Sequence, residues 1–251
     1  MTIEEMHYDF KMKLNKLDSK QRRNFLIPEI DWLLNEAQEL FIKSVAAPRG
    51  RDAAMGFERT QRSMDDVRVL VKEETVAAGG NTVHGAYAYS AATLPKAYWY
   101  FVRGLVLAKR RGCDKTLTCT LRIRQHDDLN HMSPFDRSDV MWREVNGLFR
   151  GNELLLEKPM GEEDRVEYPS VVLTYMRKPV YMHFAKGHGL GKHYMLPSGE
   201  RLDGKRDCEL PEHTHREIVD IAVMLAGSQI QGAQDMQLRI GKLQMNHLTE
   251  S

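Results

Sequence analysis

The chain has 251 residues, of which 42% are hydrophobic and 28% are charged, an ordinary composition for a globular protein. Its 36 Lys and Arg residues balance 35 Asp and Glu residues, so the formal net charge is +1. A protein that binds nucleic acid through the phosphates usually has a clear basic excess, which argues against tight nucleic-acid binding by the whole chain. The cysteines Cys113, Cys119 and Cys208 are sparse and odd in number, which favours a reducing compartment without a disulfide framework.

Targeting signals are not expected in this sequence. The first ten residues, MTIEEMHYDF, are acidic and lack the apolar core of a signal peptide. The chain also has no run of about 18 apolar residues, the length that a membrane-spanning helix needs. We therefore expect synthesis in a cytoplasm and no membrane partner.

The first third of the chain is predicted to be helical, forming a region over residues 1–78. Thr2 and Glu5 have the spacing of a capping box, in which each side chain bonds the backbone N–H of the other. Pro28 suits the first turn of a second helix, because its missing N–H would be unpaired there. The apolar stripe of that helix is Ile30, Leu33, Leu34, Ala37, Leu40 and Phe41. A third helix is expected from about residue 57 to 72, with Met64, Val67 and Val71 facing inward.

A β-domain is predicted over residues 79–207, after the glycine pair at 79–80. Tyr98–Ala108 is rich in aromatic and β-branched residues, and Thr116–Arg124 alternates between apolar and polar side chains. Together they indicate a hairpin, and Gly151-Asn152 marks the turn of another. Further strands are expected at residues 171–176 and 180–184. The domain is therefore an antiparallel β-sandwich or a small barrel.

The last part, residues 208–251, is predicted to form C-terminal helices that pack back on the helical region. Ile218, Ile221, Ala222 and Leu225 share one helical face, and Gly227 is expected to end that helix. Gln234–His247 is a second amphipathic stretch. Helices, then strands, then helices give an α+β fold.

The segment CELPEHTHRE, residues 208–217, holds Cys208, Glu212, His213 and His215, which are residue types that bind zinc. The two histidines are only two residues apart and would point to different sides of a helix, unlike the four-residue spacing of HExxH. Pro211 and Glu212 also suit the start of a helix, and Thr214 with Glu217 has capping-box spacing. A helix start is therefore the favoured interpretation, and a metal site is the alternative.

Other motifs are also weak as sites. Gly187–His193 resembles a phosphate-binding loop, but only three residues separate its outer glycines and His193 stands where Ser or Thr would hold Mg²⁺. His126-Asp127-Asp128 is similar to the His-Asp pairs of metal-dependent hydrolases, yet these residue types also form turns. We predict no catalytic, cofactor-binding or metal-ligating residues.

Two further clusters have more than one interpretation. Lys109, Arg110, Arg111, Arg122 and Arg124 gather around the first predicted hairpin. They are either a solvated turn and strand face, a charged subunit interface or a surface near nucleic acid. The aromatic residues of Tyr98–Phe101 are most simply explained by packing in a core or an interface.

Long segments of the chain resemble ring proteins, or head-to-tail connector proteins, of crAss-like and related short-tailed bacteriophages. The resemblance covers most of residues 20–226. Its segments are Arg23–Lys43, Leu94–Gly104, Pro134–Leu156, Tyr175–His183, Leu196–Gly204 and Cys208–Val223.

This resemblance implies a structural virion protein rather than an enzyme. It implies a closed homo-oligomeric ring, commonly a dodecamer, that stacks on the portal protein, contacts adjacent ring, tail or muzzle proteins and extends the DNA channel. Genomic DNA would pass through without sequence-specific binding, which a near-neutral chain would suit. It would be assembled in the host cytoplasm and located in the virion. The alternatives are another virion structural protein, such as a minor capsid, tail-hub or cargo protein, or a metal-dependent hydrolase.

Overall fold

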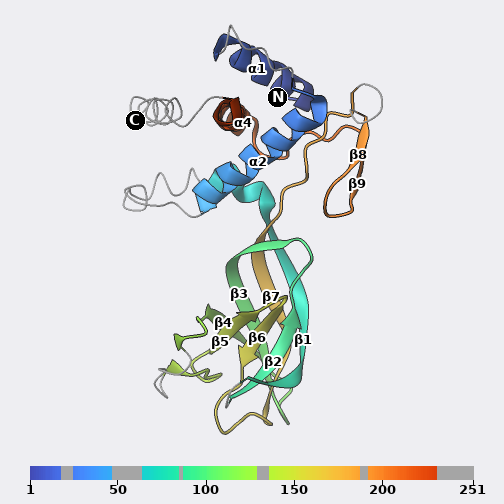
Figure 1. The fold of residues 1–251 in the computed structure, drawn as a ribbon. Coiled ribbons are helices and arrows are strands. Elements are labelled where there is room, and N and C mark those ends of the chain that lie inside the picture. Colours follow the sequence, from blue (N-terminus) through green and yellow to red (C-terminus); the bar gives the residue numbers. More distant parts are fainter. Residues whose placement is uncertain (18–24, 47–63, 85–86, 129–135, 187–191, 231–251) are drawn as a thin grey trace, which may run out of the picture. The chain divides into compact units, whose positions relative to one another are not determined.

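The computed structural model describes residues 1–17, 25–46, 64–84, 87–128, 136–186 and 192–230 (Figure 1). The fold is α+β with a small closed barrel, which confirms the predicted class and selects the barrel over the sandwich. The chain forms two compact units: a helical unit of Met1–Val69 with Pro179–Ser251, and a barrel unit of Leu70–Lys178. These bounds differ from the predicted 1–78, 79–207 and 208–251, because the first strand already begins at Val71 and the chain leaves the barrel after Lys178.

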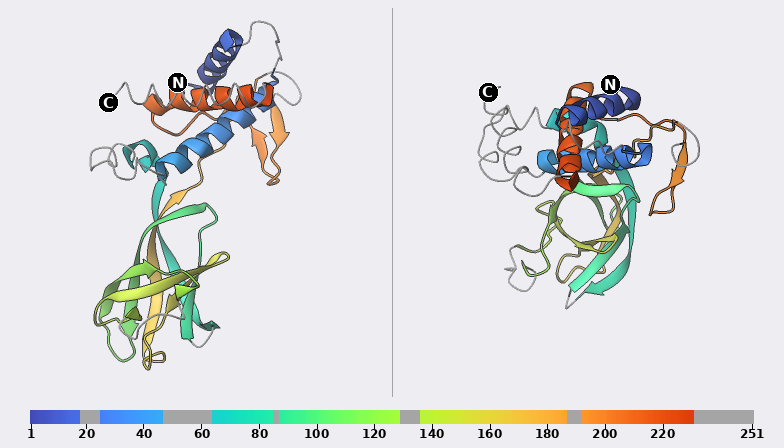
Figure 2. Two further views of the ribbon diagram at one scale, coloured as in Figure 1. Left: turned by 60° about the vertical axis from the view of Figure 1, so that its left-hand side comes forward. Right: turned by 45° about the horizontal axis from the view of Figure 1, so that its top comes forward.

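The barrel contains seven strands. They are β1 (Val71–His84), β2 (Tyr87–Thr93), β3 (Tyr98–Arg110), β4 (Thr116–Ile123), β5 (Glu144–Arg150), β6 (Glu153–Glu157) and β7 (Val166–Arg177). The strands close in the order β1-β2-β6-β5-β4-β3-β7, and the right-hand view of Figure 2 looks close to the barrel axis. The predicted hairpins are present as β3–β4 and β5–β6. Strands β4 and β5 run parallel, whereas the other neighbours are antiparallel as predicted.

Alternating side chains fill the barrel. On β4, Cys119 and Leu121 are buried, as their alternation predicted, whereas Leu117 on the same face is exposed near the end of the strand. Leu121 needs glycine on both neighbouring strands. A Cβ on Gly104 of β3 would lie 2.5 Å from Leu121 Cδ2, and a Cβ on Gly147 of β5 would lie 2.6 Å from Leu121 Cδ1. The two glycines therefore make room for one large core side chain.

The barrel has two different ends. The chain enters at Leu70 and leaves at Lys178, where β1 and β7 are paired with Val71 opposite Met176. Because β1 and β7 are antiparallel, β7 begins at the opposite end, which we call the far end. The far end also carries the start of β5 and the finish of β6, which pair with each other in antiparallel register.

The helical unit is built on α1 (Ile3–Leu17), α2 (Ile27–Ala46) and α4 (His215–Ile230), with α4 packed against the other two. The predicted capping box at the start of α1 is confirmed, because Thr2 N–H donates to Glu5 Oε2 at 2.8 Å and Glu5 N–H donates to Thr2 Oγ1 at 3.3 Å. Smaller elements are η2 (Arg68–Leu70), η6 (Glu212–Thr214) and the two-stranded sheet of β8 (His193–Met195) and β9 (Arg201–Asp203). No helix among the described residues is long and apolar enough to span a membrane.

Some local predictions for the helical unit were wrong. Residues 57–63 of the predicted third helix lie outside the described residues. The rest of it gives way to η2 at Arg68, and Val71 begins β1. Met64 is exposed rather than inward, although Val67 is buried. Helix α4 continues through Gly227 to Ile230, because one glycine lowers helix stability without breaking the hydrogen bonds. Residues 180–184 make a single bridge, between His183 and Arg206, rather than a strand. The predicted stretch Gln234–His247 lies outside the described residues.

Candidate functional site

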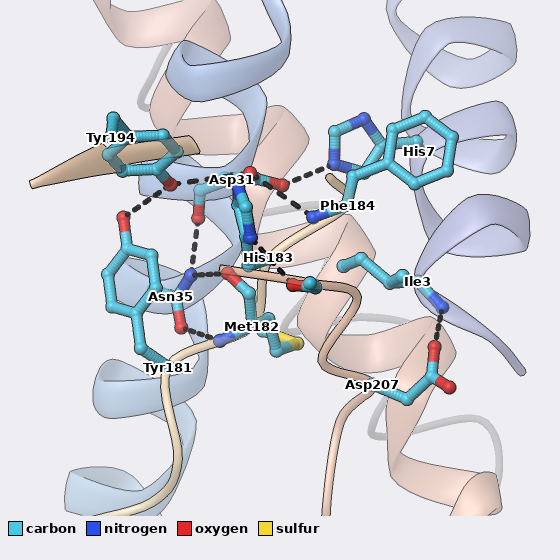
Figure 3. Close-up of polar contacts among 11 residues, drawn as sticks. Ile3, His7, Asp31, Asn35, Tyr181, Met182, His183, Phe184, Tyr194 and Asp207 are labelled. Atoms are coloured by element: carbon cyan, nitrogen blue, oxygen red, sulfur yellow. Dashed lines mark hydrogen bonds and ion pairs between the residues drawn. The ribbon is translucent and has the colours of Figure 1, made fainter. Parts of the chain in front are cut away.

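A buried polar centre around Asp31 joins several segments of the helical unit (Figure 3). The Asp31 side chain on α2 is fully buried, and its Oδ1 lies 2.7 Å from Nε2 of His7 on α1. Its Oδ2 accepts hydrogen bonds from the Phe184 N–H and the Tyr194 hydroxyl, both at 3.3 Å. Burial raises the pKa of Tyr194, so its hydroxyl stays protonated and remains a donor. One carboxylate thus links α1, α2, β8 and the segment that follows the barrel.

Asn35, one turn along α2 from Asp31, forms a two-way bond with the backbone of Met182 (Figure 3). Its Nδ2 donates to the Met182 carbonyl at 2.9 Å and its Oδ1 accepts from the Met182 N–H at 2.8 Å. The same Nδ2 also donates to the Asp31 carbonyl at 2.7 Å. The Asn35 side chain therefore satisfies both backbone polar groups of Met182, beside the single bridge that His183 forms with Arg206.

The next residue, His183, also joins two segments of the helical unit through its side chain. Its Nδ1 lies 2.8 Å from the Gly204 carbonyl, and a carbonyl can only accept, so the imidazole carries its proton on Nδ1. The buried Nε2 of His183 and Nδ1 of His7 have no hydrogen-bond partner within the described residues. The two imidazoles and Asp31 are all buried, and their hydrogen bonds hold separate segments of the helical unit together.

The barrel has its own buried carboxylate, Glu157 at the end of β6. Its Oε1 accepts from Arg137 Nη1 at 2.8 Å, and its Oε2 accepts from the Ser138 N–H at 3.1 Å and hydroxyl at 2.9 Å. Asn146 Nδ2 donates to the same Oε2 at 2.8 Å. The Arg137 guanidinium also lies 3.8 Å from the centroid of the Tyr87 ring. Glu157 therefore holds the segment before β5 against the barrel.

That segment continues into an exposed apolar turn, Val140–Arg143, which we call the Trp142 turn. Met141 is 78% exposed and Trp142 is 81% exposed, although Val140 beside them is buried. The turn lies at the far end of the barrel, because it runs directly into the start of β5. Two adjacent large apolar side chains at such exposure are a candidate contact surface for a partner.

The backbone of the Trp142 turn is tightly held. Asp139 and Glu144 exchange backbone hydrogen bonds at 2.9 and 3.1 Å, and the Met141 N–H donates to Asp139 Oδ1 at 2.7 Å. Arg143 has a φ of 57°, which is unfavourable for a side chain with a Cβ, and its carbonyl accepts from the Thr120 N–H at 2.7 Å. The exposed side chains are thus presented on ordered backbone, which lowers the entropy lost on binding.

A second exposed apolar group lies on α2 of the helical unit. Trp32 is 51% exposed and Leu40 is 41% exposed on the side of the helix that faces away from its buried stripe. The carboxylates of Glu29, Glu36 and Glu39 are exposed on the same side, where Lys43 pairs with Glu39 at 3.2 Å. We call this acidic and apolar surface the outer face of α2.

The residues around Cys208 do not converge on a metal. Glu212 pairs with the N-terminal amine at 3.0 Å, His213 Nε2 lies 2.6 Å from Asp66 Oδ1, and His215 Nε2 lies 2.8 Å from the Leu210 carbonyl. Burial raises the pKa of the Cys208 thiol to about 11, which disfavours the thiolate that zinc would bind. Pro211 precedes η6 and α4, so the segment does begin a helix, which was the favoured interpretation. The Thr214 hydroxyl donates to the Pro211 carbonyl.

The other sequence motifs also lie apart from one another. His126 Nε2 contacts the Phe149 carbonyl at 2.8 Å, and Asp127 and Asp128 are exposed. Residues 187–191 of the glycine-rich loop lie outside the described residues, while His193 begins β8. In the portions of the chain that the structure describes, no three His, Cys, Asp or Glu side chains are grouped to hold a metal ion.

The basic cluster is largely paired with carboxylates. Lys109 lies 3.9 Å from Asp114, Arg110 contacts Glu162, and Arg122 contacts Glu144. Arg124 Nε donates to Asn146 Oδ1 at 3.2 Å. Tyr98 and Phe101 pack on the barrel core, with the Tyr98 ring 5.7 Å from those of Phe149 and Tyr175, whereas the half-buried Trp99 and Tyr100 rings lie 4.8 Å from each other. Both groups therefore fit the simpler interpretation, a solvated charged face and a packed aromatic cluster.

Sequence reasoning did not single out Asp31, Glu157 or Trp142. The partners of Asp31 lie up to 163 residues away along the chain, so no local spacing reveals the centre. The one signal for the Trp142 turn is an aromatic residue within a polar stretch that precedes a strand.

Comparison with known proteins adds no identification. No protein-family model matches the sequence, and no curated protein matches it either.

Proposed function

We propose that this chain is a structural, non-enzymatic subunit of the connector ring between portal and tail in a crAss-like or related short-tailed bacteriophage. The resemblance of its sequence segments to such ring proteins suggests the assembly. The observation that carries the proposal is the Trp142 turn, where Met141 and Trp142 stand in solvent on firmly bonded backbone. This arrangement suits a subunit whose exposed surfaces become covered during assembly.

The distribution of polar side chains supports the same role. Asp31 and Glu157 are buried and hydrogen-bonded to segments far apart in the sequence, so they stiffen each unit internally. Cys208, His213 and His126, the residues that most resembled catalytic or metal-binding groups, each contact a different group: the Gln38 amide, the Asp66 carboxylate and the Phe149 carbonyl. A ring wall needs rigid subunits with two dissimilar contact faces, because heterologous contacts close by rotation.

Localisation on the virion tests the proposal. Purified particles of the encoding phage would be labelled with an antibody to this chain and imaged by electron microscopy. We expect label at a single vertex, between head and tail, and co-purification of the chain with the portal. Label spread over the shell would instead indicate a minor capsid protein, and the absence of label from particles would refute a virion role.

A further inference from the structure

We propose that the Trp142 turn of one copy of this chain docks on the outer face of α2 of a second copy. The inference deepens the proposed ring and rests on it, because it names the two dissimilar surfaces that successive subunits would bring together. Its basis is the chemistry of the two surfaces, which are complementary in both apolar character and charge.

The first surface, the Trp142 turn, carries a cation beside its apolar side chains. Met141 and Trp142 offer the apolar contact, and the exposed Arg143 guanidinium follows them directly. Trp, Met and Arg are the residue types most enriched at the centres of protein interfaces. The hydrogen bonds within the turn fix its backbone before binding, so little order remains to be created on association.

The second surface, the outer face of α2, carries more carboxylates than cations. Trp32 lies on the exposed side of α2 between Glu29 and Glu36, which are three and four residues away and so adjoin it on the helix surface. Leu40 extends the apolar strip by two further turns. An arginine from the Trp142 turn would thus meet carboxylates at the edge of an apolar contact, where such complementarity selects the partner and its orientation.

The geometry of this contact makes the association directional. The two surfaces differ, so the contact is heterologous, and each bound copy still offers one free turn and one free helix face. Such a contact propagates from copy to copy until rotation closes a ring. A tryptophan buries only about 150–250 Å² against the roughly 800 Å² per partner of a standard interface, so Trp142 acts as an anchor within a larger contact.

The test uses the purified full-length chain and measures its oligomeric state by sedimentation velocity over a concentration series. Trp142→Ser and Trp32→Ser should each raise the dissociation constant about 30-fold or more, as expected for loss of an interface anchor. Met195→Ser is the matched control, because Met195 on β8 is 67% exposed and belongs to neither surface. The control should assemble as the wild type does.

Mixing the two variants gives the decisive reading. The Trp142→Ser copy keeps its helix face and the Trp32→Ser copy keeps its turn. At a protein concentration at which each variant alone is monomeric, an equimolar mixture should therefore form heterodimers. A charge exchange provides a second test: Arg143→Glu should weaken assembly, and adding Glu36→Arg to the same chain should restore it. The substituted residues of both tests, Trp142 with Trp32 and Arg143 with Glu36, are exposed. Circular dichroism would verify that each variant is folded.

Several outcomes would overturn the inference. Wild-type chain that stays monomeric, variants that assemble normally, or a mixture without heterodimers would each show that these surfaces do not meet. Rings that form normally in both serine variants would refute this pairing of surfaces and leave the ring itself standing. Absence of the chain from the head–tail junction would refute the proposed function, whatever its association in solution.

Discussion

Glu157→Gln should destabilise the barrel by about 3 kcal/mol. The substitution removes a charge that accepts four hydrogen bonds from three residues, with a side chain only 3% exposed. Breaking a buried ion pair by removing one partner costs about 3–5 kcal/mol, because the remaining charge is left uncompensated. Here the cation is Arg137, whose side chain is 9% exposed. Glutamine retains one acceptor oxygen, so we place the loss at the lower end of that range.

The control is Glu153→Gln on the same strand. Glu153 pairs with Arg150 at 2.9 Å, but both side chains are about two-fifths exposed, and such surface pairs contribute about 0–1 kcal/mol. Urea unfolding of both variants, followed by circular dichroism, gives the comparison. If the unfolding free energies of the two variants differed by less than about 0.5 kcal/mol, the idea that Glu157 fastens the segment before β5 would fail.

Three further predictions follow from local geometry. Gly104→Ala should cost about 1–3 kcal/mol by overpacking, because its Cβ would lie 2.5 Å from Leu121 Cδ2. Leu121→Ala removes that Cδ2, so the double variant should lose less stability than the sum of the two single variants, measured by thermal melting. Ile218→Asp should lower the melting temperature sharply, because it places an unpaired charge at a fully buried position on α4, and unchanged melting would contradict that placement. At pH 8 a thiol reagent should modify the exposed Cys113 quickly and Cys208 slowly, with mass spectrometry identifying the labelled peptide. The pKa of Cys208 is raised from 9.0 to about 11, so its labelling should accelerate as the pH rises between those values. Over the same pH range the unfolded chain loses the thiol proton before the folded chain does, so the free energy of unfolding should fall.

The elements with strong local patterns could be predicted from the sequence. The period-two alternation after Thr116 identified β4, because one face of that strand is buried and the other is in water. The stripe from Ile30 to Phe41 identified α2 for the equivalent reason, although Leu40 proved to be exposed. In both cases the burial pattern repeats within a few residues, so the sequence carries it locally.

The remainder depends on contacts between distant parts of the chain. Residues 180–184 have an apolar pattern that suits a strand, but their backbone bonds go to the Asn35 side chain and to Arg206. The parallel pairing of β4 with β5 has no local signal either, since parallel neighbours need a long connection and reveal no turn. For the same reason the sequence could not show that Asp31 and Glu157 are buried and paired.

The pairing of Val71 with Met176 has a consequence for the order in which the chain folds. Residues of the helical unit precede and follow the barrel in the sequence, so α4 can meet α1 and α2 only after the barrel, a segment of about a hundred residues, has been synthesised. Closing a flexible loop of that length costs roughly 4 kcal/mol in chain entropy. A folded barrel removes most of this cost, because antiparallel partners hold their Cα atoms about 5 Å apart. The folded barrel thus lowers the entropy cost of bringing α4 to α1 and α2. Unfolding the barrel would therefore destabilise the packing of these helices even though none of their own contacts had changed.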